Sequence, residues 1–174
     1  WTVRVSSHIP VAEAASRVTE ERIIEMAGLA NTTLQSAGIA SPRIGVCALN
    51  PHGGDGGMFG REEIDIIAPA VAKIKAAGID ADGPYPADTI FVKARDGAFD
   101  AVVTMYHDQG QIAMKLMGFN KGVTVSGGLP VAIATPASGT AFDIVSKGVA
   151  DPEGMRQAFL LTCRMADARK NKAS

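Results

Sequence analysis

Short apolar runs alternate along the chain with segments whose apolar residues repeat at helical spacing. Runs that predict strands cover residues 2–7, 43–49, 100–106, 122–128 and 130–136. The run at 43–49, RIGVCAL, lies between Pro42 and Asn50-Pro51 and is apolar without alternation, which indicates a strand buried on both faces. The run at 2–7, TVRVSS, alternates instead and indicates a strand with one exposed face.

Helical periodicity fills the segments between these runs. It predicts helices over residues 19–38, 62–77, 108–118 and 151–170, since apolar residues there recur every three or four positions. The expected buried faces are Ile23, Ile24, Ala27, Leu34 and Ala37 in the first helix, Ile64, Ile67, Ala68, Val71 and Ile74 in the second, and Met155, Phe159, Cys163 and Ala166 in the last. Asp151 is a favourable N-cap for that last helix.

The alternation of strands and helices predicts an α/β fold with a mainly parallel, layered sheet flanked by helices. We expect residues 1–174 to form a single α/β unit, because 174 residues suit one domain of ordinary size. The segment 137–148, ASGTAFDIVSKG, reads as a turn that leads into a short helix.

Composition narrows the classes of function. A net charge of -1 gives no broad basic field, so we expect no nucleic-acid partner. No run of 18 apolar residues occurs, so we expect no membrane span, and the start WTVRVSSHIP does not resemble a signal peptide. Cys47 and Cys163 lie in apolar surroundings and read as buried, reduced thiols, which suits the cytoplasm.

The chain has three histidines, and each follows a predicted strand. His8 follows the run at 2–7, His52 the run at 43–49, and His107 the run at 100–106. Ligands of α/β sheets bind at the carboxyl ends of strands, so the three imidazoles could converge on a metal such as zinc. The spacing matches no compact ligand motif, and three unrelated loop histidines remain the alternative.

Two glycine-containing loops and one lysine are further candidates. The stretch 52–63, HGGDGGMFGREE, could bind an anion at a helix N-terminus or serve as a mobile turn, and Phe59 breaks the dinucleotide fingerprint. Asp143 could accept hydrogen bonds from a ribose or be a surface acid near a helix entry. Lys115 could hold a carboxylate or phosphate, or remain solvated.

Taken together, these motifs resemble the 4-hydroxythreonine-4-phosphate dehydrogenase family of pyridoxal phosphate biosynthesis. The stretches that carry the resemblance are SHIP, NPHGGDGGMFGREEID, GPYPADT, MYHDQG, GFNKGV, GLP and GTAFDIVSKGVAD. Their order and spacing match the carboxyl-terminal half of such proteins, which are about twice as long. The resemblance implies one lobe of a two-lobed enzyme with the fold of isocitrate and isopropylmalate dehydrogenases.

The resemblance also implies a metal site and its ligands. His8, His52 and His107 match three histidines that hold one divalent metal across the interface of a homodimer. Zinc is the first expectation for this ion, with magnesium, manganese and cobalt as alternatives. Asp108, beside His107, could orient a ligand, and Asp88 could do likewise.

An NAD(P)-dependent oxidoreductase is the activity that the resemblance implies. Gly139, Thr140 and Asp143 match a loop that contacts NAD or NADP, and Lys115 matches a catalytic, substrate-binding lysine. The implied substrate is a phosphorylated 3-hydroxy acid, whose hydroxyl a metal would acidify. Hydride then passes to the nicotinamide, and the β-keto acid loses CO₂.

Three positions depart from the biosynthetic members of the family. Thr124 replaces a substrate-binding asparagine, and we carry the substrate-binding role over to it. Ile133 replaces an arginine, which removes a bidentate partner for an oxyanion, and Ser138 replaces a histidine. Substrates such as 4-phospho-threonate, 4-phospho-erythronate or a cyclic dihydrodiol carboxylate therefore stay open.

Two other classes of function also stay open. A metal-dependent hydrolase would need a general base near the metal and no nucleotide loop. A non-catalytic metal-binding dimerisation domain is the other alternative, which activity of the chain alone would rule out. We expect the 174-residue chain to be inactive alone, because half of the cleft would be missing. The sequence does not decide the metal or the choice between NAD and NADP.

Overall fold

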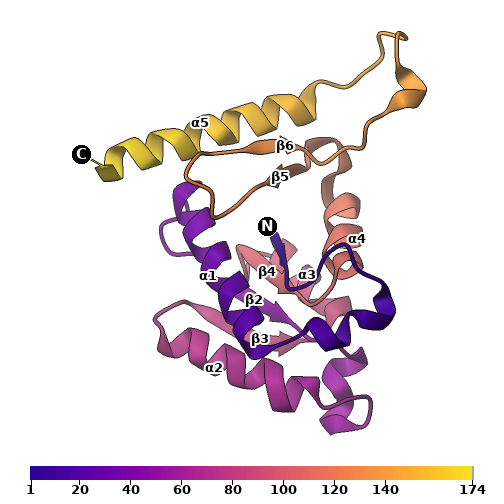
Figure 1. The fold of residues 1–174 in the computed structure, drawn as a ribbon, viewed down its shortest axis with the longest axis vertical. Coiled ribbons are helices and arrows are strands. Elements are labelled where there is room, and N and C mark those ends of the chain that lie inside the picture. The colour runs from indigo at the N-terminus through magenta and orange to yellow at the C-terminus, as the bar shows by residue number, and fades with distance from the viewer. Residues whose placement is uncertain (174) are drawn as a thin grey trace.

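A four-stranded parallel sheet forms the centre of the computed structural model, which describes residues 1–173 (Figure 1). Its strands are β1 (Thr2–Arg4), β2 (Ile44–Cys47), β3 (Ala81–Tyr85) and β4 (Ala101–Thr104). They lie in the order β1-β4-β2-β3, and every pair is parallel. The predicted α/β class with a mainly parallel sheet is thus confirmed.

Helices cover both faces of this sheet. On one face, α1 (Glu20–Ser36) and α2 (Ala68–Ala76) enclose a core that contains Val46 and Val103. On the other face, α3 (Ala87–Arg95) packs with Val102, and α4 (His107–Gly118) brings Gly110 close to the side chains of Thr2 in β1 and Thr104 in β4. Neighbouring strand residues point to opposite faces, which is why all four residues of β2 and of β4 are buried.

A smaller, antiparallel ribbon lies at one end of the molecule (Figure 1). It consists of β5 (Val123–Val125) and β6 (Ala134–Pro136), with Thr124 opposite Thr135. The last helix, α5 (Glu153–Ala173), begins against this ribbon, where Gly154 approaches Pro136. These segments lie apart from the four-stranded sheet and face it across a cavity described below.

The buried face of α5 differs from the prediction. Met155, Phe159 and Cys163 are exposed, whereas Ala158, Leu161 and Met165 are buried. The helix rests on the ribbon and on α1 through the stripe that carries Ala158, and the apolar stripe expected from the sequence faces outward. The prediction that both cysteines are buried is therefore wrong for Cys163, while Asp151 caps the helix as expected, since its Oδ1 accepts from the backbone N–H of Glu153 at 2.9 Å.

A π-helical turn over Glu63–Ile67 precedes α2 and changes which residues are buried. Ile64 and Ala68, expected in the core, are exposed, while Glu63 is 3% exposed. A π turn inserts an extra residue, so a face counted at regular helical spacing is rotated at its start. Ile67, Val71 and Ile74 lie beyond the turn and are buried as predicted.

The sequence prediction omits β3 and α3. The strand reads ADGPY, which lacks the β-branched run that identifies a strand. Glycine is required within it because a Cβ atom at Gly83 would lie 2.5 Å from the backbone oxygen of Val46. Tertiary contact with β2, and not intrinsic propensity, thus defines this strand.

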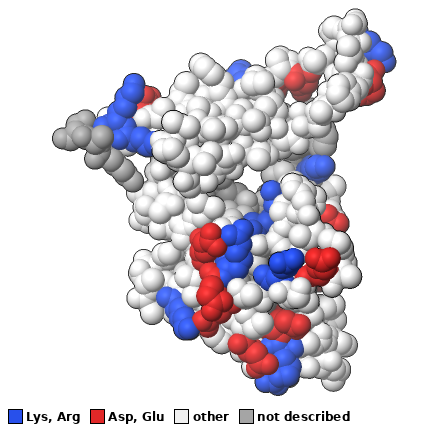
Figure 2. Space-filling view, viewed as in Figure 1, with Lys and Arg blue, Asp and Glu red and all other residues white. Residues whose placement is uncertain are grey.

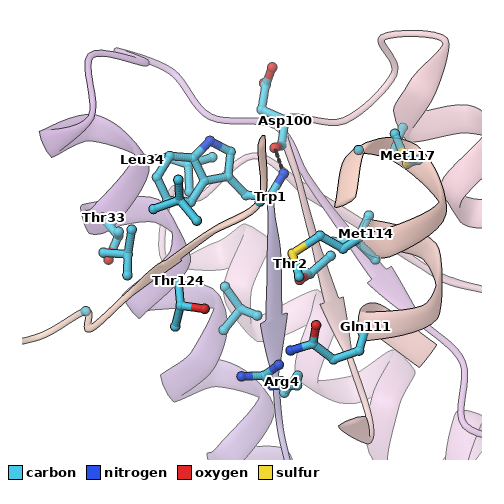
Figure 3. Close-up of a pocket in the computed structure, with 18 of the residues that line it drawn as sticks. Trp1, Thr2, Arg4, Thr33, Leu34, Asp100, Gln111, Met114, Met117 and Thr124 are labelled. Atoms are coloured by element: carbon cyan, nitrogen blue, oxygen red, sulfur yellow. Dashed lines mark hydrogen bonds between the residues drawn. The ribbon is translucent and has the colours of Figure 1, made fainter. Parts of the chain in front are cut away.

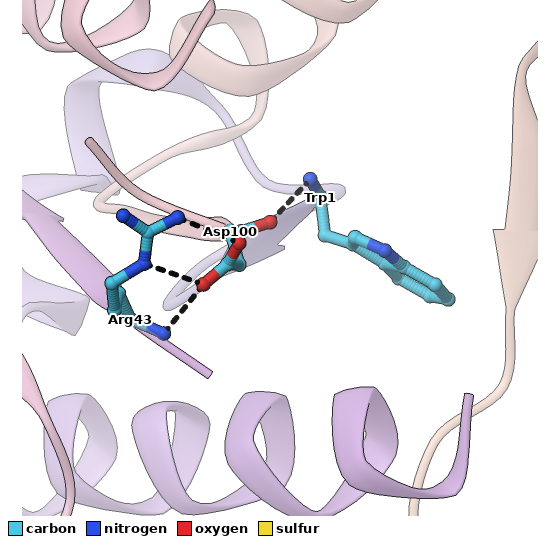
Figure 4. Close-up of polar contacts among 3 residues, drawn as sticks. All are labelled: Trp1, Arg43 and Asp100. Carbon is cyan, nitrogen blue, oxygen red and sulfur yellow. Dashed lines mark hydrogen bonds and ion pairs between the residues drawn. The ribbon is translucent and has the colours of Figure 1, made fainter. Parts of the chain in front are cut away.

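An ion pair joins the amino ends of the strands (Figure 4). The Arg43 guanidinium donates to both carboxylate oxygens of Asp100, at 3.0 and 3.1 Å, and the Trp1 amino group donates to the Asp100 backbone oxygen at 3.0 Å. The hydrogen bond from Arg43 lowers the pKa of the Asp100 carboxyl. Internal contacts therefore join the amino ends of the strands, and the candidate site residues lie at the carboxyl ends.

Acidic and basic side chains lie beside one another on the face that Figure 2 shows, without a continuous basic field. Lys73 pairs with Glu20, and Lys75 pairs with Asp82. Within the described residues, no helix has the length and apolar character to cross a membrane.

Candidate functional site

The carboxyl ends of three neighbouring strands bring the histidine loops to one edge of the sheet. β1 leads to His8, β4 leads directly to His107, and β2 leads to the loop that carries His52. Because β4 lies between β1 and β2, His107 belongs to the middle strand of the three.

Two buried or partly buried side chains fasten these strand ends together. Ser6 donates its hydroxyl hydrogen to the Met105 backbone oxygen at 2.8 Å, which joins the end of β1 to the end of β4. The Gln109 carbonyl accepts from the Met105 backbone N–H at 2.8 Å, and its amide donates to the Ala48 backbone oxygen at 2.9 Å. Gln109 thus bridges the ends of β4 and β2 directly beneath the histidine loops.

His8 and His107 form a pair. Their ring centroids are 5.6 Å apart, with the ring planes at 46°. Both rings line a cavity of about 420 Å³, together with Tyr106 and the segment 7–11. The sequence analysis expects His8, His52 and His107 to converge, and within one chain the structure brings His8 and His107 together.

Asp108 contacts the ring of its neighbour. His107 Nδ1 lies 2.7 Å from Asp108 Oδ1. A proton on Nδ1 would be donated to this carboxylate, which leaves the lone pair of Nε2 for an ion or a substrate. The hypothesis that Asp108 orients a metal ligand stays a prediction.

His52 lies apart from this pair, in an unusual turn. Residues 52–57 all have positive φ, and two of them, His52 at 55° and Asp55 at 44°, are not glycine. Its ring contacts Phe59 at a centroid separation of 6.2 Å. Left-handed backbone costs about 1–2 kcal/mol per non-glycine residue, so surrounding contacts must hold this turn.

Glu63 supplies those contacts. One carboxylate oxygen accepts from the backbone N–H groups of Leu49 and Asn50, at 2.8 and 2.7 Å, and the other accepts from the Asn50 side chain at 2.9 Å. Burial alone would raise the pKa of the Glu63 carboxyl, but these hydrogen bonds outweigh it and lower the pKa below its usual value. The carboxylate is therefore ionised at neutral pH and fixes the entry to the turn.

The His8 and His107 rings are spaced as two ligands of one metal ion would be. Two imidazoles on one tetrahedral zinc ion have centroids separated by about 5 Å, given Zn–N bonds of about 2 Å, so the His8–His107 separation fits two ligands. Among residues 1–173, however, no three His, Cys, Asp or Glu side chains gather closely enough to hold an ion. One chain therefore supplies a pair of candidate ligands, and His52 does not complete a three-histidine site within it.

A second cavity, of about 570 Å³, adjoins the histidine cavity (Figure 3). It lies between β1, α4 and β5, and Ser7 lines both cavities. Thr124 of β5 faces this space, as do Arg4 of β1 and Gln111 of α4. Lys115 is exposed on α4, in the same helix that begins with His107.

The remaining candidates lie elsewhere. Gly139, Thr140 and Asp143 are exposed in the loop between β6 and α5, outside the two cavities described above. The helix expected there is only a 3₁₀ turn over Phe142–Ile144. Asp88 lines a separate groove between α3 and α4, which it shares with Asp108.

Sequence reasoning missed Ser6, Gln109 and Glu63. Gln109 lies within MYHDQG, but its role depends on the position of Ala48, which is distant in sequence. Glu63 reads as a favourable charge in a first helical turn, and only the π turn directs it inward. No local pattern identifies these contacts.

Comparison with known proteins agrees with these observations. The family described as pyridoxal phosphate biosynthetic protein PdxA matches residues 1–162. A Pseudomonas aeruginosa protein with the provisional name 4-hydroxythreonine-4-phosphate dehydrogenase 2 is 63% identical over 167 residues, which are 95% of this chain and 50% of that protein. The D-threonate 4-phosphate dehydrogenase of Pectobacterium atrosepticum is 42% identical over 94% of the chain and 50% of its own length.

A solved structure of a relative also matches this chain over about half of its own length. The 4-hydroxythreonine-4-phosphate dehydrogenase of Klebsiella pneumoniae matches with a TM-score of 0.83 and 38% identity, over 95% of this chain and 50% of that one. The chain thus spans about half the length of the relatives that it matches.

Proposed function

The chain belongs to the family of the pyridoxal phosphate biosynthetic protein PdxA, and from this premise we propose that it is the carboxyl-terminal half of a metal- and NAD(P)-dependent dehydrogenase. Its substrate is a phosphorylated 3-hydroxy acid, oxidised at the secondary hydroxyl. The observation that carries the proposal is the His8–His107 pair at adjacent strand ends, inside the region that matches the family.

The third imidazole comes from a second copy of the chain. His52 lies apart from the pair within one chain, so a homodimer in which the partner subunit's His52 approaches His8 and His107 would provide three nitrogen ligands. Three histidines with an open fourth position are typical of catalytic zinc sites. The divalent ion, when bound, supplies Lewis acidity that favours loss of the hydroxyl proton.

Exposed apolar side chains support such a dimer. Met58, Phe59 and Ile64 are exposed around the His52 turn. A second exposed set, Val92, Ile112 and Leu116, borders the groove between α3 and α4 that also contains Asp108. Burial of one set against the other would bring a His52 turn toward the histidine pair of the partner, and apolar patches of this kind commonly mark interfaces.

Residues of this chain have separate tasks in the proposed reaction. Asp108 orients the His107 ring through Nδ1, and Ser6 and Gln109 hold the strand ends that carry His8 and His107. Lys115 and Thr124 contact the substrate, and Lys115 places a positive charge toward its carboxylate or phosphate. Gly139, Thr140 and Asp143 contact the nucleotide, which accepts the hydride.

D-threonate 4-phosphate is the second candidate substrate. The relative from Pectobacterium atrosepticum bears the name of that activity. Thr124 and Ile133, which replace an asparagine and an arginine expected in biosynthetic members, favour a substrate held differently from 4-hydroxythreonine 4-phosphate.

Activity can be tested in a fusion of this chain to the amino-terminal half of the Pseudomonas aeruginosa relative. We expect NADH or NADPH to form with 4-hydroxythreonine 4-phosphate or D-threonate 4-phosphate when zinc, manganese or cobalt is present. The unfused chain serves as the control and should produce neither.

Variants of the fusion separate the classes of function. His107→Ala should abolish both metal retention and nicotinamide reduction, whereas Arg17→Met, an exposed substitution on the surface, should change neither. Hydrolysis of a phosphate ester without nicotinamide reduction would instead identify a metal-dependent hydrolase. Stoichiometric metal without either activity would identify a metal-binding dimerisation domain.

A further inference from the structure

Arg4 is a cation without an acidic partner in the part of the chain that the structure describes. It lies on β1, where Val3 and Val5 pack into the core beneath α1, so its side chain leaves the opposite face of the sheet. There it is partly buried and lines the 570 Å³ cavity (Figure 3). Within residues 1–173, no ion pair or hydrogen bond of its guanidinium is found.

Among the described side chains, the one acidic residue that lines this cavity, Asp100, already has a cationic partner. Asp100 lines the same space, but its carboxylate is bound by the Arg43 guanidinium. Burial lowers the pKa of Arg4, and no carboxylate offsets this effect. Desolvating a charge without a partner costs free energy, so such a group commonly serves a ligand of opposite charge.

Neutral hydrogen-bonding groups surround the same space. The Gln111 amide approaches from α4 and the Thr124 hydroxyl from β5, and both are drawn with Arg4 around one opening in Figure 3. Ser7 lies at the junction with the histidine cavity. A guanidinium with amide and hydroxyl donors matches the acceptor pattern of a carboxylate or phosphate.

We propose that Arg4, Gln111 and Thr124 form an oxyanion-binding subsite, which takes the carboxylate or phosphate group of a small ligand. Ser7 lines both this cavity and the cavity that holds His8 and His107. A ligand that spans both cavities would carry an oxyanion at one end and a metal-binding or hydrogen-bonding oxygen at the other.

Its assignment to substrate recognition rests on the proposed function. In that setting, Arg4 supplies from β1 the guanidinium that Ile133 does not provide from the segment before β6. Arg4 would thereby determine specificity, since an arginine on a different element holds the oxyanion from a different direction. The binding of an oxyanion itself depends on neither metal nor nucleotide.

Trp1 gives a direct readout, because it is the single tryptophan and it lines the same cavity. The 174-residue chain is titrated with inorganic phosphate and, separately, with acetate, without metal or nucleotide, while Trp1 fluorescence is recorded. Isothermal titration calorimetry provides a second measurement of the same dissociation constants. The variants are Arg4→Met, Arg4→Lys and Thr124→Val, with Arg17→Met as the matched control, since Arg17 is exposed and paired with Glu13.

We expect saturable binding in the wild type and in Arg17→Met, and a dissociation constant raised about tenfold or more in Arg4→Met, as loss of a charge-assisted bidentate contact predicts. Arg4→Lys should fall between them, because an ammonium keeps the charge without the fork. The anion that binds more tightly identifies the group that the subsite accepts.

Equal dissociation constants in the wild type and Arg4→Met would overturn the proposal, and so would the absence of saturable binding of both anions. If Arg4→Met does not fold by circular dichroism, Arg4→Lys and Thr124→Val decide the question, and unchanged binding in both would count against it. Failure of the dehydrogenase assay with Arg4-dependent anion binding would reject the proposed function and leave the subsite standing.

Discussion

At the scale of single residues, the carboxylate of Glu63 holds the turn that carries His52. We predict that Glu63→Gln lowers the free energy of unfolding at neutral pH by about 1–3 kcal/mol, because the new amide nitrogen would meet the amide donor of Asn50. Chemical denaturation of the two proteins measures this difference. Glu62→Gln is the neighbouring control, since Glu62 accepts from the Asn50 side chain, whereas the backbone N–H groups of Leu49 and Asn50 donate to Glu63.

The same residue gives a pH dependence with a definite sign. The pKa of the Glu63 carboxyl is lowered in the folded protein from its ordinary value of 4.5. Its stabilisation is therefore fully present above pH 4.5 and is lost as the pH falls from there through the folded pKa. The stability difference between wild type and Glu63→Gln should shrink over that acidic range, and a difference that grows there would contradict this account.

Asp108 offers a second test at residue scale. If it orients His107 for an ion, Asp108→Asn should weaken metal binding about 10–100-fold, as loss of such a supporting contact commonly does. Because Asp108 is exposed, the thermal unfolding temperature of the metal-free protein should hardly change. Competition with a zinc chelator measures the affinity for zinc. An unchanged affinity would mean that Asp108 does not orient the His107 ring for metal binding.

At the scale of elements, the left-handed turn depends on two glycines in different surroundings. A Cβ atom at Gly54 would lie 2.7 Å from a Glu63 carboxylate oxygen and 2.9 Å from the Gly60 backbone oxygen, whereas nothing lies within 4 Å at Gly53. Both residues have positive φ, at 80° and 69°. Alanine substitutions at Gly53 and Gly54 therefore distinguish the cost of backbone strain from the cost of steric contact.

We predict that Gly53→Ala destabilises the protein by about 1 kcal/mol, from strain alone, and that Gly54→Ala costs about 2–4 kcal/mol because the Glu63 contact must also shift. Thermal or chemical unfolding of both variants measures the costs. Equal losses would mean that Glu63 yields freely and does not hold the turn.

Prediction of buried residues from the sequence succeeds where the apolar pattern of an element matches the faces that the fold covers. The runs that became β2 and β4 are apolar throughout because both faces of those strands are covered. The pattern of α1 likewise predicts Ile23, Ala27 and Leu34 in the core, while Ile24 and Ala37 lie at its margin.

Prediction from the sequence fails where contacts with other elements decide which side of a helix or strand is buried. The π turn before α2 rotates Glu63 inward, and α5 carries two apolar stripes, of which the structure buries the one with Ala158 and Leu161. β3 exists because Gly83 can approach Val46 closely, a contact that local propensity does not encode.

At the scale of the whole molecule, sequence order explains part of the site. Parallel strand ends bring His8 and His107 together, as expected from their positions after β1 and β4. Strand order does not predict the position of His52 in the longer loop after β2. The conformation of that loop depends on the left-handed turn and on the hydrogen bonds that Glu63 accepts. The contacts of Gln109 likewise depend on strand order, because they join the ends of β4 and β2.

In the proposed dimer, one copy supplies His8 and His107 and a second copy supplies His52 to the same ion. Mixing of the His52→Ala and His107→Ala chains, after joint unfolding and refolding, tests it most directly by equilibrium dialysis with zinc. Each variant alone should bind no tightly held ion, whereas every mixed dimer should regain one intact site. Retention of tight zinc binding by either variant alone, or failure of the mixture to regain any, would contradict the shared site.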